Sequence, residues 1–307
     1  MKVYCSECGK ANNSENIYCK SCNATLKTEK IVYGNKINSF EELITEENYK
    51  TLSETYFSPN AYNAILEEII RIGYDKFTYN ENKSTLENVY DIVDEYVNIF
   101  SKHKGSALGY YVANEIFIDE RLPEAEQIAT LIHELTHHLF SEIFERWMMY
   151  ALKVEKNVYI ETFVLFSTIF PERKFLNEYV AHTTEGQFIL HGSQNYGSFI
   201  QIMEENKINI DEHKDLIALG RSISNDITNI LEYFIDDEFR RKIIQQYTID
   251  NVRRNYDQIK YEESPEMDEN TKTEYMGALL RSAFKACLDK EDYFKYLTTL
   301  KNEFKQK

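Results

Sequence analysis

The residues Ile128-Ala-Thr-Leu-Ile-His133-Glu134-Leu-Thr-His137-His138-Leu-Phe140 contain an HExxH motif within a helical pattern. Two histidines four residues apart project from the same face of a helix. His133 and His137 can therefore each give a ring nitrogen to one zinc ion, and Glu134 is placed to take a proton from an attacking water molecule. The motif predicts the core of a zinc hydrolase.

The residues around the motif favour an amphipathic helix that packs into a core beside the metal-binding face. Pro123 fits the first turn of this helix. The alternative interpretation is that both histidines are partly exposed helix residues without a metal. The apolar residues that recur at helical spacing are Ile128, Leu131, Ile132, Leu135 and Leu139.

Composition indicates a mostly helical protein, because the chain of 307 residues has only 10 Gly and 4 Pro. The net charge of −16 argues against nucleic acid as a partner, because a phosphate backbone would be repelled. Residues 1–5 show no apolar signal segment, and the apolar run from Val158 to Phe170 is interrupted by Glu161 and too short to span a bilayer. We therefore expect a cytoplasmic protein that does not act in a membrane.

Two CxxC pairs lie near the start of the chain, Cys5/Cys8 and Cys19/Cys22. Two such turns can direct four thiolates at one tetrahedral zinc ion. Such a site is closed and leaves no position for water, so it predicts a structural zinc rather than a catalytic one. The competing interpretation is two disulfides, which an intracellular location disfavours.

The segment 3–26 resembles the short bacterial zinc-ribbon domains that begin many otherwise unrelated proteins. In those families the ribbon is a structural or docking module. The resemblance therefore implies either a structural module or a docking site for a protein partner, and it implies no catalysis there. We place the ribbon at residues 1–27 and a linker at residues 28–38.

The rest of the chain predicts mainly helices. We expect helices that begin with a capping box at Ser39 and Glu42, at Ser58-Pro59 with Gly73 as the C-terminal cap, and at Ser84 and Glu87 with a buried face that extends to Phe100. The best strand candidate spans residues 107–119, where two apolar runs broken at residues 113–115 fit a hairpin or two consecutive strands. Helices follow from Asn157, from Pro171, and through residues 198–307, where Cys287 is expected to be a buried apolar residue and not a nucleophile.

A catalytic zinc needs a third protein donor besides His133 and His137, and an open position. With a strand ahead and Glu178 on a later helix, His133, Glu134 and His137 resemble the gluzincin metallopeptidases. The order of elements is similar to that of ImmA/IrrE-like peptidases and, around Glu178, to that of the M48-type family, over residues 105–190. The resemblance implies Glu178 as third ligand, and it implies that the strand before the motif pairs with an extended substrate. The alternative for this strand is a plain hairpin of the core.

The chain departs from these families at His182, where they place Asp or Asn as a partner of a ligating histidine. His182 can accept the same hydrogen bond, can be the third ligand in place of Glu178, or can stabilise the transition state. His191 and Tyr196 are further candidates for stabilising a tetrahedral intermediate. His138 is expected to serve packing or to support a ligand.

The sequence therefore predicts a mostly helical α+β protein, with a zincin-like peptidase domain at residues 39–307, a small edge sheet and the N-terminal ribbon. Its active-site core is expected at residues 105–190 and a helical C-terminal part at residues 198–307. The expected activity is zinc-dependent hydrolysis of peptide bonds in a peptide or protein, with one catalytic and one structural zinc. The alternative is a catalytically silent zincin-like protein that acts through protein contacts.

Overall fold

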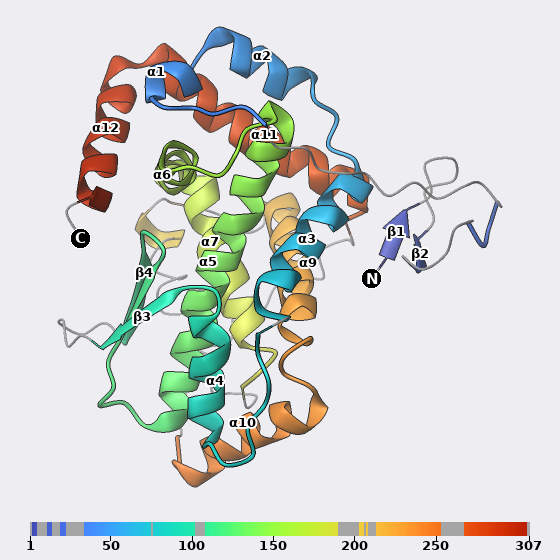
Figure 1. Ribbon diagram of the computed structural model, residues 1–307, viewed down its shortest axis with the longest axis vertical. Coiled ribbons are helices and arrows are strands. Elements are labelled where there is room, and N and C mark those ends of the chain that lie inside the picture. Colours follow the sequence, from blue (N-terminus) through green and yellow to red (C-terminus); the bar gives the residue numbers. More distant parts are fainter. Residues whose placement is uncertain are drawn as a thin grey trace. The chain divides into compact units, whose positions relative to one another are not determined.

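The computed structural model describes most of the chain. The described residues are 2–4, 11–13, 19–22, 34–74, 76–101, 108–189, 203–205, 207, 213–252 and 267–305. Among them helices predominate and the strands are short, as expected (Figure 1).

The described helices and strands carry the labels of Figure 1. The strands are β1 (Lys2–Tyr4), β2 (Ala11–Asn13), β3 (Asn98–Ser101), β4 (Gly109–Val112) and β5 (Glu115–Ile118). The helices are α1 (Phe40–Leu43), α2 (Glu46–Glu54), α3 (Pro59–Tyr74), α4 (Thr85–Asp94), α5 (Glu124–Leu152), α6 (Val158–Ser167), α7 (Pro171–Glu185), α9 (Lys214–Leu231), α10 (Asp237–Ile249), α11 (Glu269–Asp289) and α12 (Glu291–Lys305).

Contacts along the chain define two compact units. Unit 1 comprises Met1–Ile69, Ile143–Ser167 and Asp268–Lys307, and unit 2 comprises Ile70–Glu142 and Thr168–Met267. Helix α5 contributes residues 124–142 to unit 2 and its remaining residues to unit 1. The boundaries at residues 27 and 38 stay predictions.

Unit 2 contains a three-stranded sheet in the order β3-β5-β4. Strands β4 and β5 form the antiparallel hairpin that the sequence indicated, and Ala113 and Asn114 in its turn have φ values of 55° and 60°. Two consecutive positive φ values are typical of the tight turn that matches the twist of a hairpin. Strand β4 lies at one edge of this sheet.

The helix expected from Ser84 to Phe100 is wrong in its second half. Helix α4 ends at Asp94, and residues 98–101 form β3, which pairs in parallel with β5. Residues 98–101 thus bond to β5, and the Phe100 ring stacks on that of Phe117 at 5.4 Å between centroids. A short apolar run is ambiguous between helix and strand, and here strand pairing decides.

Strand β4 lies tightly against the HExxH helix. A Cβ atom at Gly109 would collide with the Thr130 side chain of α5 and would lie 2.9 Å from the carbonyl oxygen of Phe117. Glycine is therefore required at this position by the close approach of the strand, and the approach brings β4 beside the motif.

Later elements of unit 2 hold the two site-bearing helices. Helix α9 packs on α7, where Gly220 leaves room for the Tyr179 ring and Thr184 and Ser224 share a hydrogen bond of 3.0 Å. At the start of α5, the backbone N–H of Ala125 donates to Asp250 Oδ2 at 2.8 Å. A distant carboxylate thus caps the motif helix and faces its positive end.

Three predicted helix caps can be compared with the structure. The Ser84–Glu87 capping box forms, whereas at Ser39 only half of it does, because Glu42 accepts the N–H of Asn38 instead. Gly73 does not cap α3 but lies inside its last turn, where a Cβ atom would sit 2.9 Å from the Tyr96 ring.

Unit 1 has its own aromatic core. The buried Trp147 ring packs on Phe57 at 4.2 Å between centroids, and the buried Lys272 pairs with Glu269 at 2.6 Å. Cys287 is buried as expected, with 3% exposure, and burial raises the pKa of its thiol to about 12.

Of the helices in the described part of the chain, none combines the length and apolarity that a bilayer crossing needs.

We expect Asp250→Ala to destabilise the protein by about 1 kcal/mol, the typical cost of losing a helix cap. Asp250→Asn should cost less, because the amide oxygen can still accept the Ala125 N–H but has no charge. Denaturant unfolding of the three proteins measures this order. Equal midpoints would show that the cap contributes nothing.

We expect native Cys287 to resist alkylation at pH 8. The raised pKa keeps the thiol protonated, so the reactive thiolate falls by on the order of 10³-fold relative to the unfolded chain. Mass spectrometry of the Cys287 peptide after iodoacetamide treatment, with and without denaturant, measures this. Equal labelling in both conditions would contradict the buried position.

Candidate metal centre

The HExxH histidines meet as the motif predicts. His133 and His137 lie one turn apart on α5, and their Nε2 atoms are 3.1 Å apart. His133 is mostly buried and His137 is 6% exposed, so both rings lie inside unit 2. The presence of a metal at these two rings stays a prediction.

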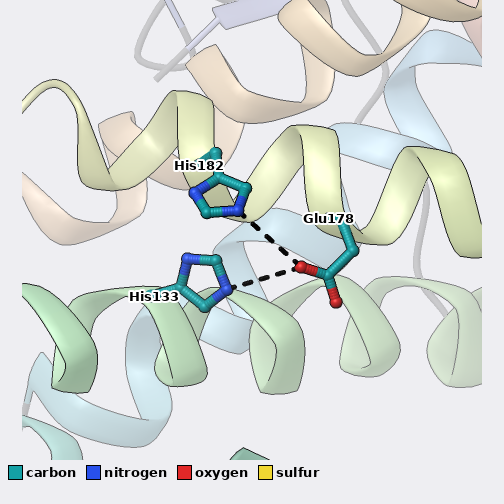
Figure 2. A group of neighbouring side chains, drawn as sticks. All are labelled: His133, Glu178 and His182. Carbon is teal, nitrogen blue, oxygen red and sulfur yellow. Dashed lines mark ion pairs between the residues drawn. The ribbon is translucent and has the colours of Figure 1, made fainter. Parts of the chain in front are cut away.

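Helix α7 brings a carboxylate to these two nitrogens. Glu178 Oε2 lies 3.7 Å from His133 Nε2, and its Oε1 lies 3.7 Å from His137 Nε2. His182, one turn further along α7, places its Nε2 3.9 Å from Glu178 Oε2. Figure 2 shows His133 from one helix and Glu178 and His182 from the other pointing toward one another.

These donors can hold a metal ion. The ligand atoms of His133, Glu178 and His182 all lie within 4.8 Å of one another. An ion bound tetrahedrally at ~2.0–2.1 Å separates its ligands by about 3.3 Å. The contacts of His133 with His137 and Glu178, at 3.1 and 3.7 Å, are close to that spacing. Imidazole and carboxylate donors suit zinc and other divalent transition metals.

A further carboxylate, not anticipated from the sequence, supports this group. Glu185 Oε2 lies 3.0 Å from His133 Nδ1 and 3.5 Å from His182 Nδ1. Glu185 is 7% exposed and stands one turn after His182 on α7. Its contact with Nδ1 of His133 favours the tautomer that leaves Nε2 for a metal.

Glu134 is buried beside the donors and has an unusual proton affinity. Burial raises the pKa of its carboxyl to about 7, the nearby His133 lowers it in part, and the carboxylates of Glu178 and Glu185 raise it further. The backbone N–H of Tyr111 on β4 donates a hydrogen bond to Glu134. A buried carboxyl with a pKa near neutrality suits a group that takes up and releases a proton.

The pKa shifts of the other groups in the cluster favour a charge on Glu178 and His133 and the neutral form of His137 and His182. Burial opposes ionisation of Glu178, yet His137 and His133 hold its pKa far below the usual range. Burial also opposes a charge on His133, but Glu178 and Glu185 raise its pKa well above the usual value. Burial lowers the pKa of His137 to about 4 and lowers that of His182.

Neighbouring residues complete the surroundings of the cluster. His137 Nδ1 and Asn177 Oδ1 are both buried without a hydrogen bond of good geometry, although Asn177 is close enough to raise the pKa of His137. The Nδ1 atom of His138 lies 3.3 Å from the hydroxyl of Tyr111 on β4. His138 thus joins β4 to α5.

Some predicted site residues lie outside the described part of the chain, namely Cys5, Cys8, His191 and Tyr196. Strands β1 and β2, which flank the first CxxC pair in sequence, pair antiparallel. This pairing is compatible with a ribbon, and the structural zinc stays a prediction.

The two cysteines of the second CxxC turn differ in their surroundings. Cys19 is buried, and the backbone N–H of Ser21 donates to its Sγ at 3.4 Å. Cys22 is exposed. The other two predicted ligands, Cys5 and Cys8, lie outside the described residues, and zinc ligation by the four cysteines stays a prediction.

Comparisons with protein-family models, with curated proteins and with solved structures gave no match.

We expect Cys5→Ser/Cys8→Ser to remove about one equivalent of zinc, because half of the predicted four-thiolate set is lost. The cluster on α5 and α7 should keep its own metal. Metal analysis of the purified variant beside the original protein measures this. An unchanged zinc content would contradict a four-cysteine site and favour the disulfide interpretation.

Proposed function

We propose that this protein is a zinc-dependent metallopeptidase of the gluzincin type. The observation that carries the proposal is the convergence of His133, His137 and Glu178 beside a buried Glu134 whose pKa is near 7. The donors alone would suit many metal proteins. A separate carboxyl group with a pKa suited to proton transfer is what a hydrolase needs in addition.

A bound zinc ion would polarise the scissile carbonyl and lower the pKa of the attacking water. Glu134 takes the proton of that water and returns it to the amine of the leaving group. The raised pKa of Glu134 supports both transfers, because the carboxylate is basic enough to accept the proton and acidic enough to release it. Burial of the site limits competing water.

Strand β4 is the proposed binding edge for an extended substrate. Its partner β5 covers one side, and no strand of the described residues pairs with its other side. The hydrogen bond from Tyr111 N–H to Glu134 brings this strand next to the catalytic carboxyl. A peptide added to this edge would gain main-chain hydrogen bonds and would pass the metal donors.

The second CxxC turn supports a separate role for the N-terminal segment. An N–H···S bond of the kind seen from Ser21 to Cys19 stabilises a thiolate. We propose that a structural zinc closes this ribbon and that the ribbon docks a protein partner.

Glu134→Gln separates a peptidase from a silent metal protein. The variant should keep its zinc, because Glu134 is not among the donors, but loss of the base should lower cleavage of a denatured protein by on the order of 10²–10⁴-fold. Cleavage assays and metal analysis on the same sample measure both properties.

Glu142→Gln is the matched control, since it makes the same change at another buried carboxyl of α5, about two turns away. It should retain both zinc and cleavage. Cleavage at an unchanged rate in Glu134→Gln would assign the hydrolysis to another site or to a contaminant. No cleavage by the original zinc-loaded protein would favour the silent, protein-binding alternative.

A further inference from the structure

His133 and His182 hold equivalent positions between two carboxylates. One oxygen of Glu185 faces Nδ1 of both rings, at 3.0 Å from His133 and 3.5 Å from His182. One oxygen of Glu178 faces Nε2 of both rings, at 3.7 Å and 3.9 Å respectively. The ring centroids of the two histidines are 4.5 Å apart.

This arrangement prepares both rings in the same way. A carboxylate can only accept, so a ring nitrogen within hydrogen-bonding distance of one carries the proton. Glu185 lies 3.0 and 3.5 Å from the two Nδ1 atoms, whereas Glu178 lies 3.7 and 3.9 Å from the two Nε2 atoms, which is too far for a hydrogen bond, so Nε2 keeps its lone pair. Glu185 thereby leaves Nε2 of both rings as the metal-binding atom. His182 is 5% exposed and Glu185 is 7% exposed, so solvent does not compete strongly for these contacts.

We infer that His182 is a fourth protein donor to the metal, together with His133, His137 and Glu178. Glu185 is then a positioning residue that orients two ligands, His133 and His182, from one carboxylate oxygen. This inference rests on the metal-binding part of the proposed function and is independent of whether a peptide is cleaved.

The number of donors constrains the metal. An ion with four protein ligands in a tetrahedron is closed, so a site that also binds a substrate must take five or more ligands. Zinc can expand to five ligands during catalysis, and iron, cobalt and nickel also accept sets rich in imidazole. His182 therefore sets both how tightly the ion is held and how far its coordination must expand.

The test observes each histidine separately in the full-length protein. The chain has 7 histidines, so long-range ¹H–¹⁵N spectra of histidine-labelled protein can resolve each ring, and single substitutions assign them. Zinc added to the metal-free protein should shift Nε2 of three rings, those of His133, His137 and His182. Cysteine ligands of a ribbon would not contribute to this readout.

Zinc affinity by chelator competition is the second measurement. His182→Ala should weaken zinc binding at this centre by more than ~100-fold, and Glu185→Gln by about 10–100-fold, the usual effect of losing a group that orients a ligand. His138→Ala is the matched control, because it removes another buried imidazole of α5, one that contacts the hydroxyl of Tyr111 and is not among the proposed donors. It should leave affinity unchanged.

The outcomes distinguish this inference from the proposed function. A zinc shift at His133 and His137 with none at His182 would overturn the fourth donor and leave the peptidase proposal intact. Shifts at all three rings in a protein that cleaves nothing would support the inference and overturn the peptidase proposal. No zinc shift at any ring would overturn both.

Discussion

The hydrogen bond between Glu185 and His133 joins the two helices on which the candidate site depends. It connects α7 to α5 inside unit 2, where Glu134, His137, His182 and Glu185 are each at most 7% exposed. Burying ionisable groups is costly unless they pair or share protons. The cluster meets this requirement by charging some members and neutralising others, with a proton favoured on His133 and opposed on His137. A divalent cation would offset the charge of the carboxylates and would require the neutral imidazoles that burial favours at His137 and His182.

The helices around the site hold α5 and α7 in position. Tyr179 against Gly220 and Thr184 against Ser224 fix the back of α7 on α9, while its front carries the donors. Asp250 at the end of α10 caps the start of α5. Donor atoms must be held within a fraction of an ångström, and that precision comes from packed helices rather than from loops.

The sequence predicted the parts of the site that depend on local periodicity. The spacing of His133 and His137 on an amphipathic helix was sufficient to bring their nitrogens together, and the apolar runs before it predicted the hairpin. Strand β3 could not be recognised, because its pairing with β5 is a contact between distant residues and its four residues continue an apolar pattern. Glu185 was not recognised either, although it follows Glu178 and His182 at helical spacing, because its contact with His133 depends on how α5 and α7 cross.

The intact Glu134 bears on whether such a site works as an enzyme. A metal held only for stability needs ligands, and a further buried carboxyl among them would add repulsion without benefit. Here the carboxyl of Glu134 lies near the carboxylates of Glu178 and Glu185, both of which raise its pKa. The backbone of edge strand β4 donates a hydrogen bond that orients it. A group kept in an unfavourable environment at the position where a proton would be transferred is better explained by chemistry than by packing, which favours the hydrolytic interpretation.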